Sequence, residues 1–318
     1  HLMGFSKNPH CELVAIASRT EEHANALSKR FNIPNVYFGN DGWIKMIENE
    51  KLDIVSICTP NYLHASITLK AIEKNCHVLC EKPIAITQEE LNQMEAILNA
   101  KDLIFFSSFQ KRYNPTFKLI KNIIERGILG KITLIRYYFS HYGPYKSWNA
   151  LSEEKWFFDS QKAGGGVLLD LGVHCIDILR FLLGDYDKVT GFNYNTTCIN
   201  LEDEDNCTVL FRFKNDTTGL ISVSWCNEPS ETIDIFGTNG YIKVDISGRK
   251  PPLYGPRKLK KSQVIKDLIE IKSGNELAQN MLINNFINCI QTKKQESPNF
   301  SDGRKAVEFV LEAYCFKK

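Results

Sequence analysis

In the first third of the chain, short apolar runs alternate with longer stretches of helical periodicity. Short runs rich in β-branched residues predict strands, and apolar residues recurring every three or four positions predict helices. The run over 53–58 is almost continuously apolar, which is typical of a parallel strand covered on both faces. The predicted strands are 12–17, 36–38, 53–58, 77–80 and 103–106, and the predicted helices are 21–30, 43–47, 63–74 and 87–100. Repeated βα units predict a doubly wound parallel sheet with right-handed crossovers.

The pattern changes from about residue 131, where strand-like runs follow one another without intervening helices. Turn signals at Asn215-Asp216 and Thr238-Asn239-Gly240 separate some of them. Strands are predicted over 133–140, 188–194, 207–213, 219–225, 232–236 and 241–244, and helices over 167–183, 277–291 and 302–314. We therefore expect an α/β plus α+β protein. A Rossmann-type dinucleotide-binding domain over 1–120 would precede a substrate-binding and oligomerisation domain over 121–318. The second domain would be an open-faced, mostly antiparallel sheet with helices on one face.

Composition excludes several classes of partner. A chain of 318 residues has room for two cores, and its net charge of +2 gives no argument for nucleic acid or an anionic membrane surface. No apolar run approaches the roughly 20 residues that cross a bilayer. The ten cysteines are scattered through apolar patterns without a Cys-x-x-Cys motif, which predicts reduced core thiols, a cytoplasmic protein and no metal site.

A lysine followed by a proline marks the end of one predicted strand. Glu81-Lys82-Pro83 directly follows the run 77–80, and open α/β sheets carry their chemistry at the carboxyl ends of strands. Pro83 fixes its own φ and favours an extended Lys82, so that the ammonium group projects from the strand end. Taken alone, Lys82 is better explained as a solvated lysine at a strand end, but its two neighbours favour a functional role.

A glycine run leads the predicted helix 167–183. Gly164-Gly165-Gly166 precedes Asp170 and His174, which lie four residues apart and hence on one helix face. The glycines permit close approach to a ligand, or form only a flexible loop. His174 has apolar neighbours and could be a satisfied core histidine. Lysine, carboxylate and imidazole brought together would suit proton transfer coupled to hydride transfer at a carbinol carbon.

Four motifs together resemble the Gfo/Idh/MocA oxidoreductase family. They are Ile-Cys-Thr-Pro-Asn-Tyr-Leu-His at 57–64, Cys-Glu-Lys-Pro at 80–83, Phe-Gln-Lys-Arg-Tyr-Asn-Pro at 109–115, and Ala-Gly-Gly-Gly at 163–166 with the Asp170, Gly172, His174 and Asp177 that follow. The resemblance covers almost the whole chain. It implies a Rossmann domain, an open-sheet domain, a nicotinamide cofactor and a sugar or polyol substrate.

The resemblance also implies residue roles. Lys82 corresponds to the lysine that contacts nicotinamide and substrate, and Asp170 and His174 to the substrate-binding and acid/base positions. The roles of Lys82 and His174 could be exchanged. The expected cofactor-binding residues also include Cys58, Thr59, Pro60, Asn61, His64, Glu81, Pro83 and Gln110. Expected substrate contacts are Arg112, Tyr113 and Trp156, with Tyr142 and Tyr145 as further options. Core or rim packing explains all four of the aromatic residues equally well.

Two features depart from the family pattern. The family begins with a strand and a glycine-rich turn that holds the pyrophosphate, whereas His1-Leu2-Met3 already resembles the end of the first helix. We therefore expect a preceding segment of about 20 residues in the source protein. The second departure is Phe157, which follows Trp156 where many relatives have an arginine and leaves a polar cofactor contact there open.

The residues after the strand 12–17 bear on the choice of cofactor. An acidic residue there would bind the ribose 2′-hydroxyl of NAD and repel a 2′-phosphate. Ser18-Arg19-Thr20 instead offers two hydroxyls and a guanidinium suited to phosphate, so the sequence favours NADP over NAD. The alternative is that Ser18 and Thr20 only form a turn before a helix and that Arg19 is solvated.

The expected function is NAD(P)-dependent oxidoreduction of a sugar, polyol or sugar derivative at a CH–OH group. The alternative is a catalytically idle relative that acts as a nucleotide-binding regulatory or scaffold protein. A third reading is reduction of a sugar nucleotide, in which the basic segment 257–262 could meet a diphosphate, although a solvated loop explains that segment better. We also expect a homodimer or homotetramer formed through the open sheet face, since a face with alternating apolar residues usually finds a partner.

Overall fold

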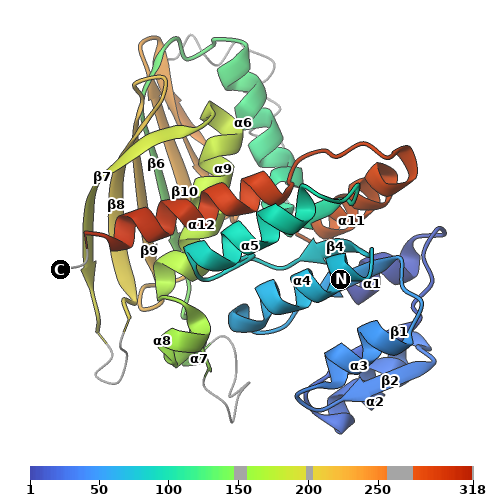
Figure 1. The fold of residues 1–318 in the computed structure, drawn as a ribbon. Helices are drawn as coiled ribbons and strands as arrows, with labels where there is room; N and C mark the ends of the chain where they lie inside the picture. Colours follow the sequence, from blue (N-terminus) through green and yellow to red (C-terminus); the bar gives the residue numbers. More distant parts are fainter. Residues whose placement is uncertain (147–155, 198–202, 256–274, 317–318) are drawn as a thin grey trace. The chain divides into compact units, whose positions relative to one another are not determined.

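The computed structural model describes residues 1–146, 156–197, 203–255 and 275–316; the basic segment 257–262 lies outside them. The chain forms two compact units (Figure 1). The first unit comprises His1–Ser108 and Gln279–Gly303, and the second comprises Phe109–Ala278 and Arg304–Lys318. The sequence-based division placed a single boundary after residue 120, whereas in the structure a late segment returns to the first unit.

The first unit is the expected parallel α/β fold. Strands β1 and β2 pair in parallel, as do β3, β4 and β5 in a second sheet. The strands are β1 (Ala15–Ser18), β2 (Asn35–Phe38), β3 (Ile54–Ile57), β4 (His77–Cys80) and β5 (Phe105–Ser107). The helices are α1 (Leu2–Lys7), α2 (Glu21–Phe31), α3 (Gly42–Asn49), the 3-10 helix η1 (Asn61–Leu63), α4 (His64–Glu73), α5 (Gln88–Leu98) and most of α11 (Asn275–Thr292). A segment preceding the chain stays a prediction.

Local signals fix the ends of these elements. The Thr87 hydroxyl accepts the backbone N–H of Glu90, and the Glu90 carboxylate accepts the N–H of Thr87, so a reciprocal capping box begins α5 where the sequence predicted a helix start. Such a cap stabilises a helix by about 1 kcal/mol. Helix α11 joins this unit through long-range packing: the Phe106 ring lies 5.3 Å from that of Phe286.

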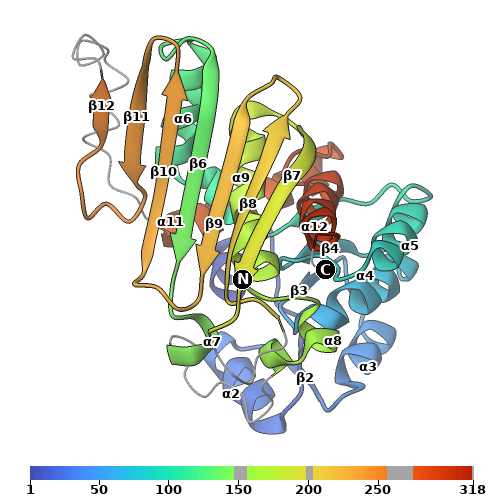
Figure 2. The same ribbon diagram turned by 90° about the vertical axis from the view of Figure 1, so that its left-hand side faces the viewer.

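The second unit is the expected open-faced sheet. It has seven strands in the order β12-β11-β10-β6-β9-β8-β7, and all neighbours are antiparallel except β6 and β9. The strands are β6 (Ile132–Ser140), β7 (Tyr186–Asn195), β8 (Asn206–Phe213), β9 (Thr218–Ser224), β10 (Ser230–Gly237), β11 (Gly240–Asp245) and β12 (Leu253–Gly255). Figure 2 shows the uncovered face of this sheet.

Helices cover the other face of the sheet. The Phe309 ring of the last helix packs edge-on against Phe211 of β8 and Tyr186 of β7, at centroid distances of 4.9 and 5.1 Å. The helical elements of this unit are η2 (Gln110–Tyr113), α6 (Pro115–Glu125), α7 (Gly143–Lys146), η3 (Trp156–Phe158), α8 (Ser160–Ala163), η4 (Leu168–Gly172), α9 (Val173–Leu183) and most of α12 (Phe300–Tyr314). No helix within the described parts of either unit is long and apolar enough to cross a membrane.

The predicted helix 167–183 is not one regular helix. Residues Leu168–Gly172 form a π-helical turn, and the α-helix α9 begins only at Val173. A π-turn contains an extra residue, so it rotates the side chains before it relative to those after it. Asp170 lies in the π-turn and His174 in the first turn of α9, so the regular helical spacing assumed from the sequence does not describe this pair.

Candidate functional site

A buried histidine ties together two strand ends in the first unit. The imidazole of His64 is 1% exposed, with Nδ1 2.7 Å from the carbonyl oxygen of Pro83 and Nε2 2.7 Å from that of Thr59. Burial lowers the pKa of His64, although these carbonyl contacts oppose the shift. His64 therefore links the backbone after β3 to the backbone after β4 at Pro83, the residue that follows Lys82.

Lys82 lies half-buried directly after Glu81 at the end of β4, and its peptide bond to Pro83 is cis. Glu81 Oε1 accepts hydrogen bonds from Ser108 Oγ at 2.8 Å and from His1 Nε2 at 2.9 Å. Burial raises the pKa of Glu81, but the hydrogen bonds from His1 and Ser108 and the charge of Lys82 outweigh it and leave that pKa below its usual value. The lysine therefore stands beside a carboxylate.

His1 is a neighbour of this site that the sequence did not suggest. Its imidazole also contacts Ser56 Oγ at 2.7 Å and Cys58 Sγ at 3.2 Å. Burial lowers the pKa of His1, but hydrogen bonding and charge from Cys58 and Glu81 raise it to about 10. His1 and Glu81 thus form an ion pair at the carboxyl ends of β3 and β4.

Thr59 provides an observation on cofactor fit. Its Oγ1 is buried and makes no hydrogen bond to any described residue. A buried hydroxyl is costly unless it finds a partner, and the carboxyl ends of parallel strands are where such folds bind nucleotides. Thr59 therefore fits a bound dinucleotide, and Cys58, Pro60 and Asn61 flank it at the end of β3.

The residues considered for cofactor choice lie at the end of β1. Thr20 caps α2, since its Oγ1 accepts the backbone N–H of His23 at 3.4 Å. Ser18 Oγ lies 3.2 Å from Nδ1 of His23, and Arg19 is exposed. Thr20 therefore has the turn-forming role considered for it, and the exposed Arg19 directly follows the end of β1.

In the second unit, Asp170 is held by a tryptophan. The indole Nε1–H of Trp225 donates to Asp170 Oδ2 at 3.0 Å, and His141 Nε2 lies 4.0 Å from the same oxygen. Trp225 is 1% exposed, so its ring is a fixed support. His174 is also buried, with its ring edge-on to Phe109 at 6.2 Å.

The glycine run approaches protein groups closely. A side chain at Gly166 would place its Cβ 2.0 Å from the carbonyl oxygen of Glu204. The Glu204 carboxylate is buried and accepts hydrogen bonds from Tyr314 Oη at 2.8 Å and from the backbone N–H of Leu168 at 3.1 Å. The glycine run thus approaches Glu204 and Tyr314, which anchor the start of the π-turn that carries Asp170, and its close approach to a ligand stays a prediction.

Arg112 has a structural partner within this unit. Its guanidinium donates three hydrogen bonds to Asp177, of 2.6, 2.9 and 3.1 Å, and both side chains are nearly inaccessible to solvent. This buried pair joins η2 to α9, and we leave Arg112 out of the substrate site proposed below. Gln110, in the same turn, has a buried Oε1 without a hydrogen bond among the described residues. That oxygen fits a ligand-facing role.

The aromatic residues considered for substrate contact have neighbours of their own. Tyr142 donates to Glu228, and Tyr145 donates to Asp205 at 2.8 Å. The ring of Trp156 stacks on that of Phe157 with centroids 3.6 Å apart, and Lys118 lies 5.3 Å from the Tyr113 ring centroid. Phe157 therefore serves as a packing partner for Trp156.

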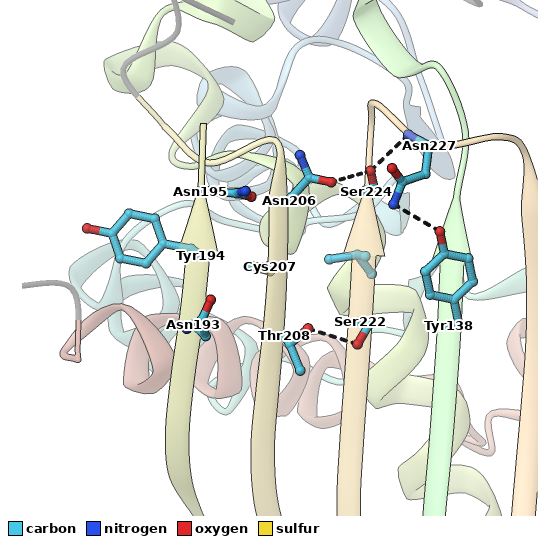
Figure 3. A pocket seen from close by; sticks show the side chains of 11 residues that line it. Tyr138, Asn193, Tyr194, Asn195, Asn206, Cys207, Thr208, Ser222, Ser224 and Asn227 are labelled. Carbon is cyan, nitrogen blue, oxygen red and sulfur yellow. Dashed lines mark hydrogen bonds between the residues drawn. The ribbon is translucent and has the colours of Figure 1, made fainter. Parts of the chain in front are cut away.

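The uncovered face of the sheet has a hollow of about 280 Å³ (Figure 3). Neutral polar side chains dominate its lining: Thr208 bonds Ser222 at 2.9 Å, and Asn227 donates to Tyr138 at 3.1 Å. We expected apolar residues to alternate on this face. The apolar side chains instead lie farther along it, where Leu210 is 41% and Leu253 61% exposed.

A parallel dinucleotide-type unit with a lysine at a strand end, followed by an open-faced sheet unit with an acid and a histidine, defines a two-domain oxidoreductase architecture. Residues 1–109 match the family model described as "Oxidoreductase family, NAD-binding Rossmann fold", and residues 117–243 match the "GFO/IDH/MocA C-terminal domain". The chain therefore belongs to the Gfo/Idh/MocA oxidoreductase family, which confirms the resemblance seen in its motifs.

Curated relatives include several dehydrogenases. Levoglucosan dehydrogenase of Pseudarthrobacter phenanthrenivorans is 34% identical over 177 residues, which are 55% of this chain and 43% of that protein. D-glucoside 3-dehydrogenase of Escherichia coli is 30% identical over 58% of this chain and 50% of its own length. Myo-inositol 2-dehydrogenase of Thermotoga maritima is 24% identical over 73% and 67%. The chain thus spans about half the length of the first two relatives.

Solved structures share the fold of the whole chain. Levoglucosan dehydrogenase in complex with NADH and L-sorbose has a TM-score of 0.82 at 24% identity, and the match covers 99% of this chain and 91% of that one. The WlbA dehydrogenase from Bordetella pertussis, in complex with NADH and UDP-GlcNAcA, has a TM-score of 0.84 at 20% identity, with 99% and 91% covered. These likenesses confirm the predicted fold class.

Proposed function

We propose that the chain is an NAD(P)-dependent oxidoreductase that transfers hydride between nicotinamide C4 and a carbinol or ketone carbon of a sugar or polyol. The observation that carries the proposal is Lys82 at the carboxyl end of a parallel strand, where His64 contacts the carbonyl oxygen of the next residue, Pro83, and that of Thr59 after the neighbouring strand. The names of the relatives, which include dehydrogenases of levoglucosan, myo-inositol and D-glucosides, support the substrate class.

A bound nicotinamide would supply the hydride acceptor or donor. Thr59, whose buried hydroxyl has no partner within the described parts of the chain, would help to hold it, together with the neighbouring Cys58, Pro60 and Asn61. The Lys82 ammonium would stabilise alkoxide charge as it develops on the substrate oxygen, or relay its proton. His174 would take up or return the hydroxyl proton, and Asp170, oriented by Trp225, would anchor a neighbouring hydroxyl.

We propose a preference for NADP on the basis of Arg19. A guanidinium binds a 2′-phosphate well, and no carboxylate stands among Ser18, Arg19 and Thr20 to repel it. The KM for NADPH should be at least tenfold below that for NADH, and Arg19→Ala should remove most of the difference. A strong NADH preference in the unmodified protein would contradict the preference without affecting the proposed reaction.

We also propose that the chain self-associates through the open face of its sheet. Leu210 of β8 and Leu253 of β12 are exposed on this face, and contact with a second copy would remove their side chains from water. Light scattering after size exclusion should report a dimer or tetramer, and Leu210→Glu should shift it toward monomer. A monomeric parent protein would rule this out.

The test of the reaction is a substrate panel read by nicotinamide absorbance. Levoglucosan, D-glucose, methyl β-D-glucopyranoside and myo-inositol would each be offered with NAD and with NADP. At least one should be oxidised with saturation kinetics. Cofactor binding by calorimetry with no turnover on this panel or on the corresponding ketones would favour the idle, nucleotide-binding alternative.

A further inference from the structure

An imidazole and an exposed thiol lie side by side at the end of β3. Nδ1 of His1 lies 3.2 Å from Cys58 Sγ and 2.7 Å from Oγ of Ser56. Ser56 and Cys58 are two residues apart, so they lie on the same side of the extended backbone, and Ile57 between them is buried. The Cys58 side chain is exposed, so a small molecule in solution can reach its sulfur atom.

The surroundings of His1 hold its imidazole as a cation. Its Nε2 lies 2.9 Å from Glu81 Oε1, and Ser108 Oγ lies 3.1 Å from the same nitrogen. Burial lowers the pKa of His1, but hydrogen bonding and charge from Cys58 and Glu81 raise it to about 10. The positive charge is therefore present at neutral pH, and water screens it weakly because the side chain is only 7% exposed.

This arrangement is typical of a nucleophilic cysteine. The thiolate, not the thiol, attacks electrophiles, and a neighbouring imidazolium stabilises the thiolate. A sulfur atom, an imidazole and a carboxylate in this order also match a nucleophile whose partner base is oriented by a third group. Cys315 is the other exposed thiol in the described parts of the chain, and its sulfur lies 3.4 Å from the carbonyl oxygen of Leu311. A carbonyl oxygen accepts the S–H and favours the thiol, so Cys58 and Cys315 should differ in reactivity.

We propose that hydrogen peroxide oxidises Cys58 reversibly and that the oxidised side chain blocks dinucleotide binding. The thiolate sulfur attacks one peroxide oxygen, the O–O bond breaks, and the leaving hydroxide takes the Nδ1 proton of His1 to become water. The sulfur loses two electrons and forms a sulfenic acid. Dithiothreitol reduces the sulfenic acid back to the thiol, with release of water, and is itself oxidised to a disulfide. The effect on binding rests on the proposed function, in which Cys58 and Thr59 belong to the cofactor site.

The test measures oxidation at each cysteine. The protein would be treated with hydrogen peroxide in the presence of dimedone, which labels sulfenic acids, and peptide mass spectrometry would report the rate of labelling. In the folded protein Cys58 should be labelled about tenfold faster than Cys315 or more, and in urea the two rates should become equal. His1→Gln, which removes the cation, should lower the Cys58 rate about tenfold. His10→Gln, at an exposed histidine of the same unit, is the matched control and should leave that rate unchanged.

The outcomes separate this inference from the proposed function. Equal labelling of Cys58 and Cys315 in the folded protein, or an unchanged Cys58 rate in folded His1→Gln, would overturn it. If His1→Gln does not fold, the comparison of the folded parent with the parent in urea decides.

Calorimetry with NADP and with NAD tests the block of dinucleotide binding. Binding should be lost after oxidation and restored by dithiothreitol, and binding that survives full oxidation of Cys58 would overturn the block. If the untreated protein binds neither dinucleotide, the proposed function fails, whereas the labelling rates still decide whether Cys58 is oxidised.

Discussion

The two units hold their proposed chemical groups in different ways. In the first unit, Lys82 emerges from the end of a parallel strand, and the nearby His64 bonds only backbone carbonyls. In the second, Asp170 depends on Trp225, a residue contributed by another element of the chain. The lysine is thus placed by local backbone geometry, whereas the carboxylate is placed by long-range contacts.

This difference predicts where a substitution changes activity without changing stability. A change at Lys82 removes a charge from a strand end without disturbing the core around it. In the second unit, a substitution of Trp225 changes both the buried packing and the position of the Asp170 carboxylate that Trp225 holds. Substitutions in the first unit should therefore change activity without changing stability, whereas those in the second unit should change both.

The largest effect should come from removing the Lys82 ammonium. Lys82→Met should reduce kcat by about 10³-fold, because general acid–base and electrostatic contributions of one group are of that order. The melting temperature should stay within a degree or two, and Lys74→Met, at an exposed lysine of the same unit, should leave kcat unchanged. Near-normal turnover in Lys82→Met would refute the assigned role.

Substitution of Arg112, in contrast to that of Lys82, should reduce stability. Arg112→Met should destabilise the second unit by about 3–5 kcal/mol, since it leaves the Asp177 carboxylate buried and unpaired. Urea denaturation measures the loss, and the double variant with Asp177→Leu should recover part of it. A stable Arg112→Met protein that has lost only substrate affinity would instead restore Arg112 to the substrate site.

The His1–Glu81 pair predicts how stability depends on pH. The pKa of His1 is about 10 in the fold against 6.5 when it is unpaired, so the pair stabilises fully below pH 6.5 and its contribution disappears as the pH rises to about 10. The melting temperature should fall over that interval by several degrees more than in His1→Gln. Parallel pH profiles of the two proteins would argue against the ion pair.

The smallest effect should follow loss of the hydroxyl that supports the π-turn. Tyr314→Phe removes a hydrogen bond to the buried Glu204, and the free energy of unfolding should fall by about 1–2 kcal/mol. Because Asp170 lies in that turn, KM should rise modestly while the pH profile of kcat stays the same. If Tyr314→Phe lowers stability and leaves KM unchanged, the glycine run 164–166 does not couple Tyr314 to the position of Asp170.

Much of the fold could be predicted because its signals are local. The alternation of strands and helices, the capping residue Thr87 and the motif around Lys82 were all visible in short windows of sequence. Helix α6 was also within reach, because Asn114 caps it and Pro115 occupies its first turn, yet it was not predicted.

The residues that were missed depend on the fold itself. His141 and Trp225 meet only because β6 and β9 are parallel neighbours, a pairing that the antiparallel pattern of the other strands did not suggest. Likewise, Arg112 pairs with Asp177, and Gly166 lies against Glu204. Sequence spacing carries no information about such contacts.

The most direct test of the central claim is isotope transfer. The panel sugar or polyol, deuterated at every carbon, would be incubated with oxidised cofactor, and the reduced nicotinamide would be examined by mass spectrometry. Hydride transfer from a carbinol carbon predicts one deuterium per reduced nicotinamide in the wild-type protein and almost none in the Lys82→Met variant over the same time. Reduced cofactor without deuterium, or no reduced cofactor despite measurable binding of both ligands, would contradict the account.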